Sequence, residues 1–408
     1  NQTNGFDCPG CAWPDPKHRS PFEYCENGAK AIADEATIKT IPDTFWKENS
    51  IHALGRRSDR WLNSQGRLSR PMILEKGSNH YVPLDWDRAI GIIAKTLNAL
   101  KDPNDAYFYT SGRASNEAAY LWQLLARQYG TNNLPDCSNM CHESSGVALN
   151  ESIGIGKGTV RLEDFDKADL IVVVGQNPGT NHPRMLSALK SAKKSGASIL
   201  SINPLKETGM RRFRHPQSPI DMLGAGTQIS DDHVDIKVNG DMALFRAIGS
   251  IILDKGVHDM DFINLNTTGF LDYANIARAV DWGLTEDLTG QSRDRIYEIS
   301  DYFCRSKRTI VCWAMGITQH KNSVNTIREI MNVLLLKGDI GREGSGPCPV
   351  RGHSNVQGDR TVGITHAPGK FFIEKLSKEF DIDIPPEHGA DSVNCLLYTS
   401  PSPRDRYG

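Results

Sequence analysis

The stretch DLIVVVG, residues 169–175, decides the fold class of this 408-residue chain. Five consecutive apolar residues between an aspartate and a glycine are typical of a parallel strand that is covered on both faces. A helix is expected to begin at Pro183 and to end at Gly196. Leu186 and Leu189 are its inward residues, and a second strand follows in ASILSINP. Together these segments predict a strand–helix–strand unit.

A second unit of the same kind begins at RTIVCWAMG, residues 308–316. Its helix is expected to stop at Gly338 and to turn one apolar face inward, formed by Ile327, Ile330, Met331 and Leu334. Two such units predict an α/β protein with doubly wound, mostly parallel sheets. Upstream, SNEAAYLWQLLARQYG predicts a helix between Ser115 and Gly130. The residues at helical spacing in it are Leu121, Leu124, Leu125 and Gln128.

Composition divides the chain into three parts. Residues 1–75, rich in Pro, Gly and Cys, are expected to form a small cysteine-containing subdomain of the iron–sulfur type. Residues 76–394 are expected to form an α/β region of two interleaved domains. Residues 395–408, which begin CLLYTSPSPRD, resemble an in-frame translation of a sequencing adapter, so Cys395 is left out of the metal ligands. The natural chain is then expected to continue beyond about Asn394, and a flexible Ser/Pro tail is the alternative.

Charge and hydropathy narrow the classes of function. The chain carries 47 Lys and Arg against 49 Asp and Glu, a net charge of −2, which gives no electrostatic footprint for nucleic acid. Its apolar runs fall short of the roughly 18 residues that a membrane-spanning helix needs. We therefore expect a cytoplasmic protein with no nucleic-acid partner and no membrane segment.

Polar loops follow the predicted strands at the positions where doubly wound sheets bind ligands. The first loop is GQNPGTNHP, residues 175–183, whose glycines and following helix N-terminus suit a phosphate. A nicotinamide site would need G-x-G-x-x-G and an acidic residue after the second strand, where Asn203–Pro204 stands instead. The second loop, residues 341–360, holds five glycines and three arginines and suits an anionic ligand, although a plain surface loop has a similar composition.

The N-terminal cysteines indicate a metal site. Cys8 and Cys11 have C-x2-C spacing, and Cys25 follows. This set suits an iron–sulfur cluster or, with His18, a closed zinc site.

Cys141 lies in the polar stretch NMCHESSG. On its residues alone this stretch leaves four roles open for Cys141: a buried filler, a zinc ligand, a nucleophile or the ligand of a heavier metal. Cys304 and Cys312, in or near an apolar strand, are expected only to fill space.

Several stretches, taken in order, resemble one family, the molybdopterin-dependent oxidoreductases of the formate dehydrogenase type. The run leading into the metal site of that family resembles SGRASNEAAY, LAR, GTNN and MCH. Its pterin-dinucleotide segments resemble GQNPGTNHP, SINP, NGDMAL, MGITQH and PVRGHSNVQGD. Its YdeP-type branch resembles DCPGCAWPDPKH and EYCENGAKAIADEAT, and the likeness covers about residues 5 to 370.

The resemblance implies the family's fold and a catalytic subunit with a molybdenum bis(molybdopterin guanine dinucleotide) and often one 4Fe–4S cluster. Cys141 takes the position of the molybdenum ligand, His142 that of a proton acceptor, and Arg351 that of the residue that orients an anionic substrate. The implied reaction is two-electron oxidation of a small anion, formate by analogy, with electrons leaving through the cluster to an unnamed partner. The matching cofactor positions are Lys30, Arg113, Gly175, Asn177, Gly179, His182, Asn203, Pro204, Gly240, Asp241, Gly316, Gln319, Gly352, Ser354, Asn355, Gln357 and Gly358.

Two departures from the family pattern concern the cluster. The family motif has four cysteines, whereas this chain offers Cys8, Cys11 and Cys25, so the cluster and its fourth ligand stay open. Asn27 replaces the lysine of the family's C-x-K-G run, with Lys30 as the substitute. A zinc-stapled α/β nicotinamide dehydrogenase and a non-catalytic metal-binding subunit are the alternative functions. The family's C-terminal pterin-binding domain is expected to be missing, so the chain alone is expected to be inactive.

Overall fold

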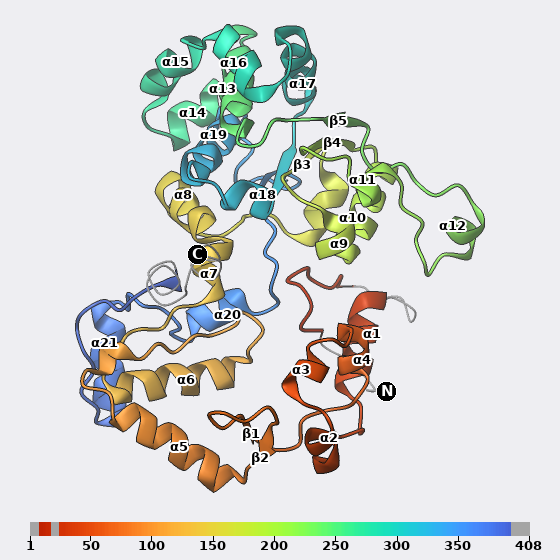
Figure 1. The fold of residues 1–408 in the computed structure, drawn as a ribbon. Helices are drawn as coiled ribbons and strands as arrows, with labels where there is room; N and C mark the ends of the chain where they lie inside the picture. Colours follow the sequence, from red (N-terminus) through yellow and green to blue (C-terminus); the bar gives the residue numbers. More distant parts are fainter. Residues whose placement is uncertain (1–7, 18–23, 393–408) are drawn as a thin grey trace.

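The computed structural model describes residues 8–17 and 24–392 of the chain. Figure 1 shows an upper lobe, coloured yellow to light blue, above a lower lobe that combines orange and dark blue segments. The red N-terminal helices lie beside the lower lobe (Figure 1). His18 and the adapter-like residues 395–408, including Cys395, lie outside the described residues.

The upper lobe is built on a five-stranded sheet in the order β5-β4-β3-β6-β7, and every neighbouring pair is parallel. The central strand is β3, the run from which the fold class was predicted, and the chain winds outward from it in both directions. The predicted doubly wound α/β fold is therefore confirmed. The strands are β3 (Leu170–Val174), β4 (Ser198–Ile202), β5 (Asp232–Val234), β6 (Thr309–Trp313) and β7 (Gly346–Pro349).

Alternate residues of the central strand face opposite sides of the sheet. Val172 packs into one hydrophobic cluster and Ile171 into the other, and both side chains are fully buried. Burial of one such side chain stabilises the fold by roughly 1.5–3 kcal/mol, which explains why an unbroken apolar run specifies this strand. One side is covered by α8 (Glu143–Ile153), α13 (Asp241–Asp254), α17 (Arg293–Arg305) and α19 (Ser323–Leu336), the other by α10 (Pro183–Lys194) and the 3-10 helix η2 (Leu162–Lys167).

Two of these helices agree with the sequence prediction. Helix α10 begins at Pro183 and buries Leu186 and Leu189. It is followed by Gly196, whose φ of +104° lies in the left-handed region where glycine ends a helix without strain. Helix α19 buries all four residues predicted to face inward and is followed by Gly338 at φ +62°.

The lower lobe joins segments that are far apart in the sequence. Residues 106–110 and 132–136 run side by side, with bonds from Phe108 N to Asn133 O (2.9 Å) and from Thr110 N to Pro135 O (3.2 Å). The chain leaves this lobe before the sheet of the upper lobe and returns to it after β7 (Figure 1). The helices of the lobe are α5 (Trp86–Asn98), α6 (Asn116–Tyr129), α20 (Val356–Thr361) and α21 (Lys370–Phe380).

Helix α6 has the predicted ends, and the residues it buries differ from those at the predicted helical spacing. Ser115 Oγ accepts a hydrogen bond from Ala118 N at its start, and Gly130 at φ +106° ends it. Leu121 and Leu125 are 64% and 47% exposed in the part of the chain that the structure describes. The helix instead buries Ala119, Gln123, Ala126 and Arg127, and the Arg127 guanidinium donates to Gln123 Oε1 at 2.7 Å.

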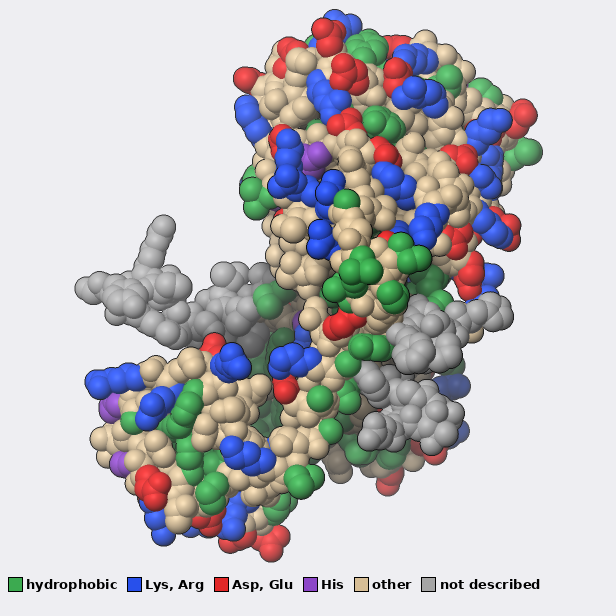
Figure 2. Space-filling model, turned by 90° about the vertical axis from the view of Figure 1, so that its right-hand side faces the viewer, with side chains coloured by type: hydrophobic (Ala, Val, Ile, Leu, Met, Phe, Trp, Pro, Cys, Tyr) green, Lys and Arg blue, Asp and Glu red, His purple; other side chains and the backbone are tan. Residues whose placement is uncertain are grey.

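The other described elements are short. The N-terminal subdomain contains α1 (Glu26–Glu35), α2 (Asp43–Glu48), α3 (Ile51–Leu54), α4 (Asp59–Asn63), β1 (Met72–Ile73) and β2 (Val82–Pro83). Elsewhere lie η1 (Pro103–Asp105), α7 (Cys137–Cys141), α9 (Pro178–Asn181), α11 (Thr208–Arg211), α12 (Pro219–Leu223), α14 (Met260–Asn266), α15 (Phe270–Arg278), α16 (Trp282–Thr289) and α18 (Met315–Thr318). Within the described ranges, no helix combines the length and apolarity needed to cross a bilayer. Side chains of both charges mix over the upper lobe, as the near-balanced composition predicts (Figure 2).

Asp339, which follows α19, is fully buried, and burial raises the pKa of its carboxyl to about 7, with only partial opposition from Thr309. The folded chain therefore binds this proton more tightly than the unfolded chain, whose carboxyl has the ordinary pKa of 3.8. Stability should fall as pH rises from about 4 to about 7, by up to about 1.4 kcal/mol per pH unit.

Asp339→Asn should remove this loss of stability. The difference between its unfolding temperatures at pH 5 and pH 8 should therefore be smaller than in the parent chain. Asp254→Asn, at an exposed position in α13, is the matched control and should keep the parent's pH dependence. An unchanged pH dependence in Asp339→Asn would contradict the assignment.

Candidate functional site

The carboxyl ends of β3 and β6 are where the doubly wound sheet changes direction, and two glycines meet there. Gly316 N donates a 3.0 Å hydrogen bond to Gly175 O. A methyl group on Gly316 would lie 2.5 Å from Gly175 O, and Gly175 itself has a φ of +55°. Both predicted glycines are therefore required by close backbone approach, and the loops after β3 and β6 are fixed against each other.

Cys141 is the last residue of α7 and is 5% exposed. Helix α18, which follows β6, holds the backbone around it. Thr318 Oγ1 donates to Cys141 O, and Gln319 Nε2 donates to Met140 O at 3.0 Å. The sequence separates these partners by more than 170 residues, so the sheet brings the predicted Cys141 and Gln319 together.

The Cys141 thiol has a polarised environment. Its sulfur accepts a hydrogen bond from Gly352 N–H and lies 3.8 Å from Met315 Sδ. Burial raises the pKa of the thiol, whereas Gly352 and the positive charge of Arg351 act in the opposite direction. A cationic metal at this sulfur would reinforce those two effects and favour the thiolate.

His142 has partners on both ring nitrogens. Nε2 lies 3.1 Å from Val350 O and Nδ1 lies 3.0 Å from Ser145 Oγ. Val350 O only accepts, so Nε2 carries the proton and Nδ1 accepts from the Ser145 hydroxyl, which in turn accepts from Trp313 Nε1 at 2.9 Å. Burial, with the nearby charge of Arg351, lowers the pKa of His142 to about 3, so the ring is neutral.

Arg351 follows β7, and a hydrogen bond to its backbone carbonyl holds it in place. His182 Nε2 donates to Arg351 O at 2.7 Å, and Gln176 Nε2 lies 3.4 Å from the other ring nitrogen of His182. The guanidinium donates to Gly156 O at 3.2 Å, and burial lowers its pKa. Gln176 Oε1 is buried without a protein partner and is available to a donor from a bound group.

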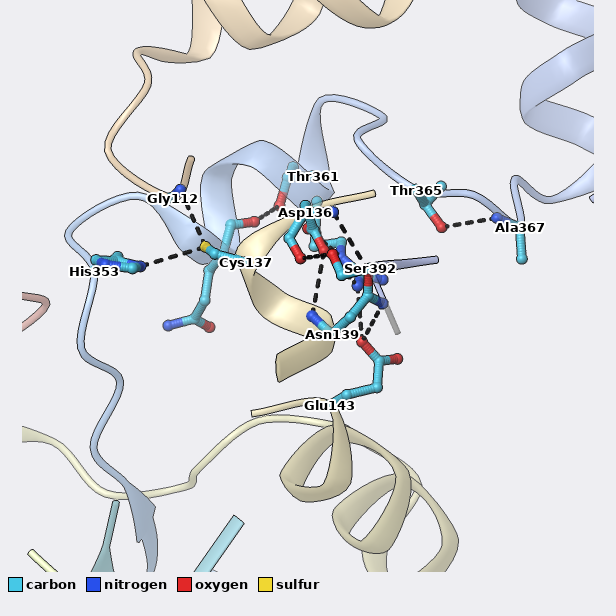
Figure 3. A network of polar contacts seen from close by, with 12 residues as sticks. Gly112, Asp136, Cys137, Asn139, Glu143, His353, Thr361, Thr365, Ala367 and Ser392 are labelled. Carbon is cyan, nitrogen blue, oxygen red and sulfur yellow. Dashed lines mark hydrogen bonds and ion pairs between the residues drawn. The ribbon is translucent and has the colours of Figure 1, made fainter. Parts of the chain in front are cut away.

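A second polar network ties α7 to the lower lobe. Cys137, one turn before Cys141, accepts from Gly112 N at 3.1 Å, and its sulfur lies 3.3 Å from His353 Nδ1 (Figure 3). Burial raises the pKa of the Cys137 thiol to about 11. Asp136, at the start of α7, binds the Arg360 guanidinium through both oxygens at 2.8 and 3.0 Å. The sequence analysis identified none of these contacts, since they join segments that are distant along the chain.

A cavity of about 410 Å³ opens beyond the ends of β3 and β4. Two of the predicted cofactor positions, Asn177 and Gly179, line it together with Glu207. Glu207 accepts from Asn177 Nδ2 at 2.6 Å and from Asn203 Nδ2 at 3.3 Å. Pro204, also a predicted position, is exposed beside Asn203.

Sequence reasoning missed several charged residues of this cavity. Glu207 follows Asn203 by four positions after the second predicted strand, which is a signal that could have identified it. The cavity is closed on one side by Tyr24 and Glu26 of the N-terminal subdomain. The cationic and imidazole side chains that line it are Arg184, Arg214 and His215.

The remaining predicted cofactor positions lie at the same edge of the upper lobe or just below it. Asp241, after Gly240 at the start of α13, is buried, which raises its pKa to about 6. Asn355 Nδ2 donates to Ala114 O at 2.7 Å, and a methyl group on Gly358 would lie 2.1 Å from Asn355 Oδ1. Gln357 lines a smaller cavity beside Arg351.

The three N-terminal cysteines converge. A methyl group on Gly28 would lie 2.7 Å from Cys8 Sγ and 3.6 Å from Cys25 Cβ, and Cys11 is close enough to both other thiols for their charges to raise its pKa, after burial as the main cause. Gly10 N donates to Cys8 Sγ at 3.2 Å. In the described part of the chain, no three His, Cys, Asp or Glu are grouped tightly enough for a single metal ion.

This cysteine loop is attached to the site in the lobes. Arg113 donates to Gly10 O and Ser354 Oγ donates to Pro9 O, both at 3.3 Å. Two predicted cofactor residues therefore connect the loop to the Cys141 region. Lys30 is not brought there, because it is exposed and pairs with an aspartate one turn later in α1 at 2.6 Å.

Comparison with known proteins gives a consistent result. The family model described as molybdopterin oxidoreductase matches residues 67–384. Protein YdeP of Escherichia coli K12 is 46% identical over 403 residues, which are 96% of this chain and 53% of that protein. A putative formate dehydrogenase of Staphylococcus aureus USA300 is 28% identical over 393 residues, 92% of this chain and 38% of that protein. The chain thus spans about half the length, or less, of the curated relatives it matches.

The fold is also similar to that of a solved enzyme structure. Acetylene hydratase from Pelobacter acetylenicus aligns with a TM-score of 0.55 at 17% identity. The alignment covers 66% of this chain and 35% of that chain.

Gly316→Ala should destabilise the chain by about 1–3 kcal/mol, because the added methyl overlaps the backbone of Gly175 rather than a movable side chain. Urea unfolding followed by circular dichroism measures the change. Gly146→Ala is the control, since a methyl group there meets nothing within 4 Å in α8 and should stabilise by about 0.5–1 kcal/mol. Equal stability of Gly316→Ala and the parent would refute the close contact.

Proposed function

The chain belongs to the molybdopterin oxidoreductase family, and on this premise we propose that it oxidises a small anionic substrate by two electrons. Its homology to YdeP and to a putative formate dehydrogenase supports the formate-dehydrogenase-like, YdeP-type branch of the family. Formate is the substrate we propose, by analogy with the latter relative, and the electrons leave through an iron–sulfur cluster to a partner protein. The family implies a molybdopterin cofactor, and we propose its bis(guanine dinucleotide) molybdenum form.

The observation that carries this proposal is the position of the Cys141 thiol at the switch point of the sheet. Its sulfur faces Gly352 N–H and the charge of Arg351, and the 410 Å³ cavity opens at the same edge of the sheet. The unpartnered Gln176 Oε1 and the backbone approach at Gly175 fit a bulky group rich in donors and acceptors. The residues present therefore fit the cofactor.

Distinct residues would hold the two ends of the cofactor. We propose that Cys141 ligates molybdenum, because a soft thiolate suits a redox metal with sulfur ligands. The nucleotide end suits the cavity around Asn177 and Glu207, where a carboxylate can accept hydrogen bonds from a guanine edge. When bound, the cofactor supplies the two-electron redox chemistry.

Arg351 would orient the anion. Its guanidinium is half-buried, so its charge is screened less than that of a surface arginine. His182 and His142 hold the backbone carbonyls of Arg351 and Val350, which sets the direction from which the guanidinium extends. We therefore propose a positioning role for His142. The proton transfer expected from the resemblance would first have to break one of its two hydrogen bonds.

We propose a cluster rather than zinc at Cys8, Cys11 and Cys25. Thiolates that bind a cluster sit at separate corners of an iron–sulfur cube, whereas zinc needs four ligands around one atom. The hydrogen bond from Gly10 N–H to Cys8 Sγ is of the kind that tunes the reduction potential of an iron–sulfur cluster. Arg113 and Ser354 link the cysteine loop directly to the site, which suits electron exit in this direction.

Cys141→Ala in the full-length protein should remove most formate-dependent dye reduction while much of the pterin stays bound, because the pterin sulfurs also hold the metal. Turnover, guanine content after acid release and the molybdenum(V) resonance spectrum are the measurements. Cys304→Ala, in α17 on the covering layer of the sheet, is the matched thiol control and should leave all three unchanged. An unaltered resonance spectrum in Cys141→Ala would exclude the thiolate as ligand.

Arg351→Ala should lower kcat/KM for formate roughly tenfold to hundredfold, the effect of losing a hydrogen bond to a charged group worth about 1.5–3 kcal/mol. Arg351→Lys keeps the charge but loses the forked geometry and should restore the rate in part. Steady-state rates over a range of formate concentrations test both variants. Identical rates in the parent and Arg351→Ala would remove Arg351 from the substrate site.

Chain purified without oxygen should contain iron and acid-labile sulfide, with broad visible absorption that dithionite bleaches. The three converging thiols are the physical reason. Cys8→Ser should lower the iron and sulfide content, whereas Cys304→Ser should not. One equivalent of zinc per chain with no sulfide would overturn the cluster assignment and favour the zinc site.

A further inference from the structure

Two cysteines to which the proposed function gives no role face each other across neighbouring strands. Cys312 in β6 and Cys348 in β7 are register partners in the parallel ladder. Both side chains point to the α10 side of the sheet, where they join the same hydrophobic cluster. Burial, with the neighbouring Cys348 thiol, raises the pKa of the Cys312 thiol. The sequence predicted only a space-filling role for Cys312, because it lies in an apolar strand, and gave no sign of its partner 36 positions later.

The two thiols differ in access. Cys312 is fully buried, whereas Cys348 is partly exposed and lines a cavity of about 100 Å³. Each molecule of liquid water takes up about 30 Å³, so the cavity has room for a molecule of the size of hydrogen peroxide. Arg161 and Arg351 also line this cavity, so a polar molecule that enters it has hydrogen-bond donors beside the Cys348 sulfur.

We propose that Cys312 and Cys348 form a peroxide-responsive thiol pair, in which Cys348 is attacked first and Cys312 resolves it. The Cys348 thiolate attacks one oxygen of hydrogen peroxide, the O–O bond breaks, and hydroxide leaves and takes up a proton to form water. The Cys312 sulfur then attacks the sulfenic sulfur, the S–O bond breaks, and a second water leaves. Two thiols are oxidised by two electrons, one peroxide is reduced, and two waters form with the disulfide.

The ladder brings the sulfurs into a range that a disulfide can span. Neighbouring strands lie about 4.8 Å apart, within the roughly 4.4–6.8 Å between Cα atoms that disulfides tolerate. A bond between directly paired residues is constrained by the ladder, and constrained disulfides are easily reduced again. The bond would fix the end of β7 three residues before Arg351, so it connects oxidation to the loop that carries the site. This inference does not depend on the proposed function.

Trypsin provides a direct readout. Cleavage at Arg308 and Lys321 releases residues 309–321 with Cys312, and cleavage at Arg342 and Arg351 releases residues 343–351 with Cys348. Each peptide carries a single cysteine. The purified chain is treated with hydrogen peroxide, acid-quenched, unfolded and alkylated before and after reduction.

The proposal expects the two peptides to be recovered as one linked species that reductant separates, with both thiols protected from the first alkylation. Full alkylation of both peptides in the first step overturns it. Recovery of Cys348 as sulfinic acid without the link also overturns it, because Cys312 would then not act as the resolving thiol.

Variants separate the two roles. Cys312→Ala should leave Cys348 as a sulfenic acid that dimedone traps, with more adduct than in the parent. Cys304→Ala is the matched control and should leave the linked species unchanged. If Cys312→Ala fails to fold, Cys312→Ser provides the same test. A Cys348 that gains no dimedone adduct in either variant refutes the order of attack.

Discussion

The close contact between the backbones of Gly175 and Gly316 is the constraint on which the site depends. It holds the loops after β3 and β6 together at the one place where the sheet changes direction. The loop after β3 leads to Asn177 and His182, and the loop after β6 leads to the helix that holds Cys141. This approach places the Cys141 thiol and the 410 Å³ cavity at one edge of the sheet.

Neutral hydrogen bonds hold the backbone carbonyls of Val350 and Arg351, whereas the ion pair between Asp136 and Arg360 holds the start of α7. The Trp313–Ser145–His142–Val350 chain is uncharged and fully paired, so it specifies the backbone of β7 without a desolvated ion. Arg351 remains the positive group beside the thiol. A site arranged this way resists collapse of its polar groups onto each other and keeps its charge available for a ligand.

The sequence predicted local structure well and distant partners poorly. Strand β3 and the ends of α10 and α19 could be predicted because each depends on a few adjacent residues. An unbroken apolar run indicates a buried strand, and a glycine at positive φ ends each helix. The outward leucine face of α6 was not predicted, because spacing identifies a face but not the neighbour that covers it.

For the candidate site, motifs identified Cys141 and the glycine positions, and resemblance supplied their roles. The Val350 partner of His142 and the Cys312–Cys348 pair became visible only in the folded chain, because the residues that meet are distant in the sequence. Lys30 was chosen by its place in a motif, and an aspartate one turn away in its own helix holds it instead.

The discontinuous lower lobe also has a consequence for synthesis on the ribosome. Asp136, which is 1% exposed, reaches its arginine partner 224 residues later. At about 5–20 residues per second, the two are made roughly 10–45 s apart. During that interval the upper lobe can fold. The first part of the lower lobe stays incomplete, with the Asp136 carboxylate unpaired and apolar surface exposed. The nascent chain therefore has a defined interval in which chaperones would find it exposed.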